Sequence, residues 1–184
     1  MKKITQQHTI EHVLEMPAPE FVFFWGHRKS DKGVTKTCFS QWYECEFVID
    51  GIAYRCAEQY MMAEKARLFG DEENLQKIIE AKTPQTMKAL GRKVKGYNAE
   101  TWDAHKFEIV VRGNIAKFSQ NEDLKSFLLG TADKVLVEAS PYDQVWGIGM
   151  KATETGVKDP SQWKGTNLLG FALMQVRDLL KEKA

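Results

Sequence analysis

Short apolar runs and long amphipathic stretches alternate along this chain, and the two patterns predict different elements. The run at 21–25 is too short for a helix and predicts a buried strand. Two apolar triplets, 47–49 and 52–54, flank the dipeptide Asp50-Gly51, which supplies the two positive φ angles that a tight hairpin turn needs. The apolar run at 135–137 predicts one more strand. The strands are short and few, so we expect a small antiparallel sheet.

Helical periodicity dominates the chain after residue 56. Thr83 and Asn98 stand where N-caps are expected, because their side chains accept hydrogen bonds from the first turn of a helix. Gly91 and Gly130 stand at the ends of two predicted helices. The pattern predicts helices over 57–69, 71–82, 84–91, 99–118, 124–129 and 167–180. The fold class that follows is α+β, a helix-rich single domain with a small antiparallel sheet.

The remaining segments are polar or punctuated by glycine. Residues 1–20 predict a polar, loosely attached N-terminal extension that precedes a domain at 21–184. Residues 27–37 predict a mobile loop, because they are polar and contain a glycine. The stretch 140–165 is longer than structureless loops usually are in compact domains, so it is a candidate for function.

The composition narrows the class of protein. The 184 residues suit one domain, and 26 Lys and Arg against 25 Asp and Glu give no electrostatic case for a dedicated duplex-DNA binder. The three cysteines match no zinc-site spacing, and His8 and His12 alone do not make a metal site, so we expect reduced thiols and no metal or cofactor. The start lacks the apolar run of a secretion signal, and no apolar stretch reaches the roughly 18 residues of a membrane helix. We therefore expect a cytoplasmic protein without membrane contact.

Glu58 is the first candidate for chemistry, because it lies in the first turn of the helix predicted over 57–69. The exposed N–H groups and the dipole of a helix favour a charged carboxylate there. Lys65 follows two turns later, near the same face, where it could hold a phosphate, and Arg92 could grip one bidentately. The alternative is structural, because acidic residues are ordinary in first helical turns and both cations are typical of solvated surfaces.

Tryptophans beside glycines are the second candidate. Trp25 precedes Gly26, and Trp146 precedes Gly147. An indole beside a glycine can present a flat face to a base, while the glycine lets the backbone approach a ligand. The alternative is that the tryptophans fill the core, which is the role we expect for Trp163.

Several short motifs follow one another in a recognisable order over about residues 21–182. They are Phe24-Trp25-Gly26, Phe39-Ser40-Gln41-Trp42-Tyr43, Ala57-Glu58-Gln59-Tyr60, Ala63-Glu64-Lys65-Ala66, Gly91-Arg92, Trp102-Asp103, Lys117-Phe118, Val137-Glu138, Trp146-Gly147-Ile148-Gly149, Gly165-Thr166-Asn167-Leu168-Leu169-Gly170 and Arg177. In this order the motifs resemble the NADAR/YbiA-like family.

The resemblance implies an α+β hydrolase that cleaves N-glycosidic bonds. Its implied substrate is a phosphoribosylamino-pyrimidine intermediate of riboflavin synthesis, or ADP-ribose attached to guanine in nucleic acid. Glu58 corresponds to the family's motif glutamate and would stabilise the positive charge that develops on the ribose. The acid beside the motif tryptophan is Asp103, and Asp143, three residues before Trp146, is a secondary acid–base candidate. The residues expected to bind substrate are Trp25, Gly26, Trp42, Lys65, Arg92, Trp102, Trp146, Gly147, Gly149 and Asn167.

The sequence departs from the family pattern at three places around these motifs. Gln41-Trp42 stands where Asn-Phe is common, Gln59 where His is common, and Ile148 where some members carry Asp. These changes leave the glutamate in place but alter what surrounds a ligand, so the choice between the two substrates stays open. The sequence does not give the oligomeric state. The main alternative function is a non-catalytic module that binds a nucleotide or ADP-ribose, and the presence of Glu58 argues for the enzyme. The second alternative is a structural protein whose tryptophans all belong to the core.

Overall fold

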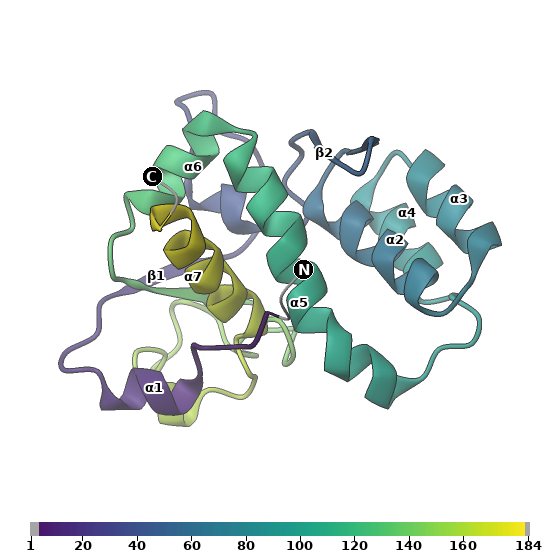
Figure 1. Cartoon of the computed structure of the whole chain (residues 1–184). Helices are drawn as coiled ribbons and strands as arrows, with labels where there is room; N and C mark the ends of the chain where they lie inside the picture. The colour runs from purple at the N-terminus through teal and green to yellow at the C-terminus, as the bar shows by residue number, and fades with distance from the viewer. Residues whose placement is uncertain (1–3, 183–184) are drawn as a thin grey trace. The chain divides into compact units, whose positions relative to one another are not determined.

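The computed structural model describes residues 4–182, which form two compact units (Figure 1). Within the described residues, unit 1 comprises 4–40 and 122–182, and unit 2 comprises 41–121. In chain order the elements are α1 (Ile10–Glu15), β1 (Phe21–Phe24), η1 (Lys36–Phe39), β2 (Phe47–Ile49), β3 (Ile52–Tyr54), α2 (Ala57–Leu68), α3 (Glu72–Glu80), α4 (Pro84–Gly91), α5 (Ala99–Ser119), α6 (Glu122–Leu129), β4 (Val135–Glu138), η2 (Pro160–Gln162) and α7 (Leu168–Lys181). The helix-rich α+β class with a small antiparallel sheet is confirmed.

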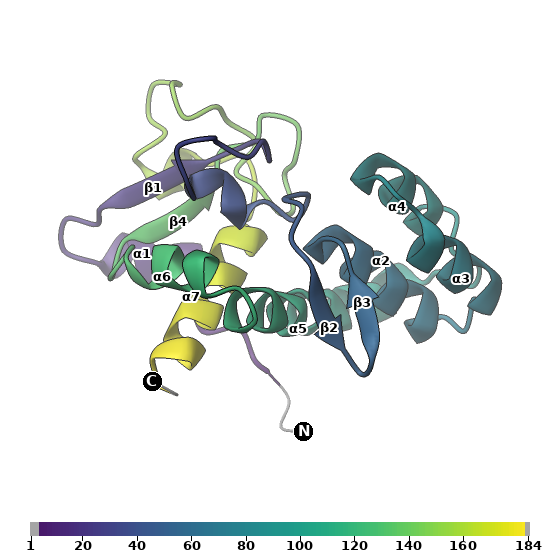
Figure 2. The same cartoon turned by 90° about the horizontal axis from the view of Figure 1, so that it is seen from above.

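Unit 1 is built on a parallel pair of strands, β1 and β4, which run side by side in Figure 2. Phe21 lies opposite Val135, and Phe24 lies opposite Glu138. The chain between these strands contains all of unit 2, so no hairpin joins them, and the connection is long enough for the crossover that a parallel pair needs. The sequence analysis did not foresee this pair. Helix α7 packs against β4, and most of the side chains along its length are buried.

Asn167 joins β4 to the start of α7. Its side chain is fully buried, and its backbone adopts the left-handed conformation with φ of 52°. The amide oxygen accepts the N–H of Glu138 at 3.0 Å, and the amide nitrogen donates to the C=O of Leu136 at 2.9 Å. A single side chain thus pairs with the strand as a neighbouring strand would, because it offers one acceptor and one donor. These contacts place the first turn of α7 on β4.

The N-terminal segment is not the loosely attached extension that its polarity predicts. Val13 of α1 is buried, the backbone N–H of Gln7 donates to the side chain of Gln175 at 3.1 Å, and His8 Nε2 lies 2.7 Å from Asp178 Oδ2. One apolar anchor and two polar contacts to α7 therefore order the described part of this segment. Its polar composition hid these contacts because their partners lie about 170 residues away in sequence.

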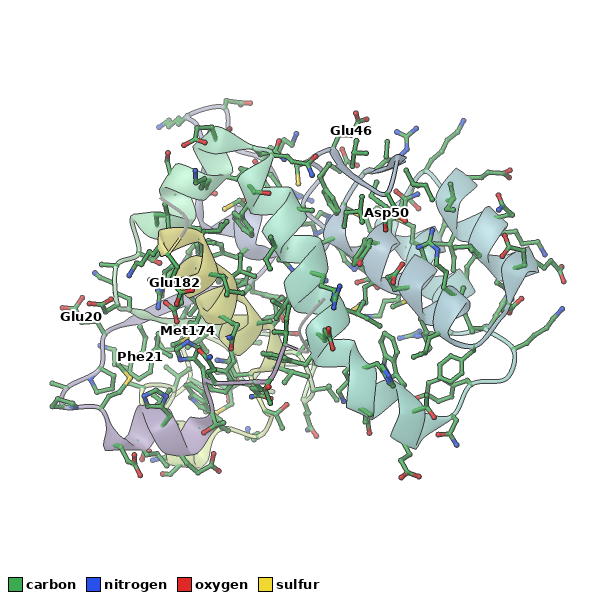
Figure 3. The ribbon with its side chains drawn as sticks, in the orientation of Figure 1. Glu20, Phe21, Glu46, Asp50, Met174 and Glu182 are labelled. Atoms are coloured by element: carbon green, nitrogen blue, oxygen red, sulfur yellow. The ribbon has the colours of Figure 1, made fainter. Side chains whose placement is uncertain are left out.

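The β2–β3 hairpin of unit 2 has the predicted turn. Asp50 and Gly51 adopt φ angles of 50° and 77°, and Asp50 marks the tip of the hairpin in Figure 3. The outer strand is finished by Gln120 at the end of α5, whose amide accepts the N–H of Val48 and donates to its C=O, both at 2.8 Å. This pairing satisfies the backbone groups that an edge strand would otherwise expose.

Helix α2 lies at the centre of unit 2 and packs against α3, α4 and α5. Two glycines allow the close approach: a Cβ on Gly91 would lie 2.0 Å from the sulfur of Met62, and one on Gly113 would lie 2.5 Å from the ring of Tyr60. The predicted N-caps are confirmed, since Thr83 accepts the N–H of Thr86 and Asn98 accepts that of Thr101 (residues at the third position of each helix). The core of the unit thus holds α2 rigidly.

The three cysteines are predicted to differ in reactivity, because their surroundings differ. Cys56 is fully buried, and burial raises the pKa of its thiol from 9.0 to about 11, with backbone N–H groups opposing the shift. Its thiolate fraction at pH 8 is therefore about a hundredfold below that of a free thiol. Cys38 is also buried, whereas Cys45 is half-buried. We expect a maleimide to label Cys45 first in the native protein, and all three in urea, as mapped by mass spectrometry. Equal native labelling of Cys56 and Cys45 would contradict this account.

Candidate functional site

Glu58 occupies the first turn of α2 and is only 3% exposed. Its backbone N–H donates to the C=O of Gln41 at 2.9 Å, so a neighbouring chain segment satisfies one of the free N–H groups of the helix start. Cys56, the N-cap residue, makes no side-chain cap, and the amide oxygen of Gln59 instead accepts the N–H of Arg55 at 2.8 Å. The helix start is therefore fixed by backbone and amide contacts, and the Glu58 carboxylate is placed in the interior beside it.

Lys65, two turns further along α2, is half-buried between two aromatic rings. Its Nζ lies 4.3 Å from the ring centroid of Tyr97 and 5.5 Å from that of Trp102. Burial lowers the pKa of Lys65, the positive charge of Arg92 lowers it further, and the charge of Glu58 opposes both. The lysine is thus close enough to Arg92 and to Glu58 to be influenced by each of them.

We call Glu58, Lys65, Arg92, Tyr97 and Trp102 the charged-aromatic cluster of unit 2. Arg92 follows the last turn of α4 and is exposed, so its guanidinium is available to a phosphate in bidentate geometry. Two cations, two rings and a buried carboxylate suit a ligand that carries a phosphate and a ring system. The tertiary structure therefore brings together four residues that the sequence analysis singled out, and adds Tyr97.

Trp42 lies in the same unit, half-buried, with Lys88 Nζ 5.7 Å from its ring centroid. The sequence analysis missed Lys88 and Tyr97. Lys88 sits in the last turn of α4, where a lysine is ordinary, and Tyr97 sits in the connection between α4 and α5. No local pattern distinguishes either residue, because each is identified only by its contact with a ring or cation distant in sequence.

Asp103 lies outside the charged-aromatic cluster although it follows Trp102. Consecutive helix residues point about 100° apart, so a buried Trp102 turns its neighbour outward. The Asp103 side chain is 61% exposed and pairs with Lys106 at 2.6 Å. A catalytic role for Asp103 stays a prediction that these contacts do not support.

The other predicted residues belong to unit 1, beginning with Trp25. Its side chain is 53% exposed and tilts against the ring of Tyr142, which is 84% exposed, with 6.0 Å between centroids. Gly26 follows with a φ of +85°, which lets the chain turn directly after the strand. The pair presents aromatic surface to solvent, and binding of substrate by Trp25 stays a prediction.

Asp143 organises the loop before Trp146. Its Oδ1 accepts the backbone N–H groups of Val145 at 2.9 Å and of Trp146 at 2.7 Å, which is the geometry of a side chain that mimics a turn. The half-buried Trp146 is thereby held in place. These contacts give Asp143 a structural task, and its secondary acid–base role stays a prediction.

The glycines of this loop are explained by its own packing. A Cβ on Gly147 would lie 2.9 Å from the C=O of Glu138, and one on Gly165 would lie 2.4 Å from the C=O of Gly147. Gly149 has a φ of +65°, which disfavours any side chain. Trp163 is half-buried, donates its indole N–H to the C=O of Val157 at 2.8 Å and packs edge-on against Phe21, so its contacts are structural. Both polar side-chain atoms of Asn167 form hydrogen bonds with the backbone of β4, so a contact between Asn167 and substrate stays a prediction.

Two properties of residues 4–182 bear on the class of site. No group of three or more His, Cys, Asp and Glu side chains among them is arranged to hold a metal ion. None of the helices formed by these residues combines the length and apolarity required to cross a membrane.

The family model described as the NADAR domain matches residues 23–181 and so spans both units. The chain is 46% identical over 168 residues to N-glycosidase R617 of Acanthamoeba polyphaga mimivirus, covering 89% of this chain and 98% of that protein. It is 30% identical over 142 residues to N-glycosidase YbiA of Escherichia coli strain K12, covering 77% and 80%. It is 39% identical over 131 residues to protein irg-1 of Caenorhabditis elegans, covering 70% and 62%.

A solved structure has the same fold. The NMR structure of the E. coli protein YbiA superposes with a TM-score of 0.71 at 24% identity, over 95% of this chain and 93% of that one. The superposition covers almost the whole of both chains, so the two proteins share a fold.

Proposed function

The chain belongs to the NADAR domain family and is a hydrolase acting on N-glycosyl compounds, and we propose that the bond it cleaves joins ribose C1′ to a nitrogen of a base or base precursor. Its substrate is a phosphoribosylamino-pyrimidine or ADP-ribose attached to guanine. Both carry the phosphate and the ring system that the charged-aromatic cluster suits. In either reaction water adds to C1′, the C1′–N bond breaks with its electron pair going to nitrogen, and the departing nitrogen gains a proton.

The buried carboxylate of Glu58 is the single observation that carries this proposal. Cleavage of a ribosyl C1′–N bond develops positive charge on the sugar, and a preorganised carboxylate stabilises that charge most effectively where water is excluded. Glu58 is 3% exposed, at a helix start that Gln41 and Gln59 fix. It therefore acts beneath C1′, without the reorganisation that a mobile surface carboxylate would require.

The other members of the cluster bind the remainder of the substrate. Lys65 and Arg92 neutralise phosphate, and the mutual repulsion that contributes to lowering the pKa of Lys65 is relieved when an anion binds between them. Trp102 and Tyr97 supply ring faces on either side of the ammonium. Lys65 lies seven positions after Glu58 on α2, a rise of roughly 10 Å along the helix axis. The lysine side chain spans part of this distance, and the remainder is on the scale of a ribose phosphate.

The products of the purified protein test this function. We expect incubation with a ribosylamino-pyrimidine 5′-phosphate to release the free base and ribose 5-phosphate, or incubation with an oligonucleotide carrying ADP-ribosylated guanine to lower its mass by one ADP-ribosyl group. Mass spectrometry distinguishes the two substrates, and heavy-oxygen water places the label on the sugar when hydrolysis occurs at C1′. Tight binding of either compound without any product would instead indicate the non-catalytic binding module.

A further inference from the structure

Two buried amides of unit 2, those of Gln41 and Asn114, retain hydrogen-bonding capacity that the described protein does not use. Gln41 is 7% exposed and Asn114 is fully buried. The Asn114 nitrogen donates to Gln41 Oε1 at 2.8 Å and to the C=O of Val110 at 2.9 Å. Within residues 4–182, neither Gln41 Nε2 nor Asn114 Oδ1 has a hydrogen-bonding partner. The pair therefore has one donor group, Gln41 Nε2, and one acceptor atom, Asn114 Oδ1, that are available to a ligand.

The neighbouring amide of Gln59 shows how unusual this is. Gln59 is equally buried, but its oxygen accepts the N–H of Arg55, and its nitrogen donates to the C=O groups of Ile78 and Ile79, each at 2.9 Å. Buried polar atoms are almost always satisfied, because an unsatisfied one loses its bond to water without replacement. An amide pair that leaves one donor and one acceptor unused is costly to stability, and such a cost is typical of binding sites.

The amide pair lies beside Glu58 through covalent and hydrogen-bonded connections. The backbone C=O of Gln41 accepts the N–H of Glu58 at 2.9 Å, so the residue that carries one amide is tied to the residue that carries the carboxylate. Asn114 follows Gly113, the glycine of α5 that lets the ring of Tyr60 on α2 approach. The bond from Asn114 to Gln41 therefore connects α5 to the residue whose backbone holds the start of α2.

We propose that Gln41 and Asn114 bind the 2′-hydroxyl of the substrate ribose. This inference rests on the proposed function, in which Glu58 lies beneath C1′, and the 2′-hydroxyl is carried by the adjacent carbon. A hydroxyl accepts one hydrogen bond and donates one, which complements Gln41 Nε2 and Asn114 Oδ1. The bonds form in surroundings shielded from bulk water, where they are strongest, while Gln41 Oε1 keeps its bond from Asn114.

The role of the pair is to select ribosides and to hold C1′ over the carboxylate. Hydrogen bonds to the 2-hydroxyl strengthen in the transition state of glycoside hydrolysis. A site built to bond a hydroxyl also rejects the analogue that lacks it, because its own buried groups are then left unpaired.

Binding of two sugar phosphates tests the proposal separately from catalysis. Ribose 5-phosphate and 2-deoxyribose 5-phosphate share the phosphate that Lys65 and Arg92 bind, and they differ only in the hydroxyl. We expect the wild-type protein to bind the ribose compound about tenfold more tightly, the effect of about one good hydrogen bond, as measured by calorimetry or ligand-observed NMR. A ratio near one in the wild type would overturn the assignment.

Variants locate the effect on the amide pair. Gln41→Glu keeps the oxygen that Asn114 bonds and removes the donor nitrogen, and Gln41→Met removes the whole amide at similar volume. In each variant whose circular dichroism matches wild type, we expect the affinity ratio to fall to about one. The ratio cancels the added charge of the glutamate, because both ligands carry the same phosphate. Gln85→Glu, on the exposed face of α4, is the matched control and keeps the wild-type ratio.

The outcomes distinguish a failure of the amide-pair assignment from a failure of the proposed hydrolase function. Equal binding of the two sugars by wild type, or an unchanged ratio in the Gln41 variants, overturns the role of the amide pair and leaves the hydrolase intact. Binding of neither sugar phosphate contradicts the phosphate-binding cluster and therefore the proposed function on which the amide assignment rests.

Discussion

Replacing Glu58 with Gln is expected to lower kcat by about 10²–10³-fold while leaving the fold intact, because one preorganised charge at the transition state is lost. The amide of glutamine has nearly the shape of the carboxylate, so the start of α2 and its contact with Gln41 are preserved. It carries no negative charge and cannot stabilise an oxocarbenium-like sugar. The measurement is the initial rate of release of free base, with KM determined in parallel.

Glu72→Gln is the matched control for that experiment. Glu72 also lies in the first turn of a helix of unit 2, α3, but it is exposed, and its carboxylate accepts a hydrogen bond from the Gln76 amide at 3.0 Å. Its loss is expected to change kcat by less than twofold. A Glu58→Gln protein that unfolds at the wild-type temperature and hydrolyses as fast as wild type would remove Glu58 from the mechanism. A selective rise in KM would assign it to binding.

Gly170→Ala is expected to destabilise the protein by about 3 kcal/mol, the upper part of the range for an overpacked core. A Cβ on Gly170 would lie 2.1 Å from the C=O of Leu136 and 2.6 Å from both polar atoms of the Asn167 amide. Neither neighbour can withdraw, because one is strand backbone and the other is held by two hydrogen bonds to β4. Helix α7 must therefore move away from the strand. At about 2–4 °C per kcal/mol for a chain of this length, Tm falls by roughly 10 °C.

Gly130→Ala provides the comparison for Gly170. A Cβ there would approach the C=O groups of Ser126 and Phe127 at 3.2 and 3.5 Å, and the φ angle is not positive. We expect a change below about 1 kcal/mol in the free energy of unfolding, measured by urea denaturation for both variants. Similar stabilities for the two variants would show that α7 and β4 can separate at little cost.

Local chemistry was sufficient for the elements whose determinants lie within a few residues. Asp50-Gly51 produced the hairpin because only residues tolerant of positive φ form that turn. Thr83 and Asn98 produced helix starts because their side chains bond the third N–H of their own helices. The burial of Glu58 was different, since acidic residues in first turns are usually exposed, and the resemblance rather than the periodicity distinguished it.

The N-terminal segment and the β1–β4 pair show where local patterns fail. A polar segment with a single buried anchor, Val13, cannot be separated from a solvated one until its partners on α7 are known. A four-residue strand likewise carries no information about a partner that follows the whole of unit 2. In both cases the free energy that stabilises the element comes from contacts with residues distant in sequence.

The sequence by itself determined the helices after residue 56, the hairpin, the caps and the family motif that carries Glu58, because each depends on neighbouring residues or on a short pattern. Only the tertiary structure decided which charges meet which rings. It joined Lys65 to Tyr97 and Trp102, turned Asp103 to solvent, and left Gln41 and Asn114 with one donor and one acceptor to offer. The physical reason is that binding and electrostatic stabilisation act through distances of a few ångströms in space, which helix packing sets and the order of residues does not encode locally.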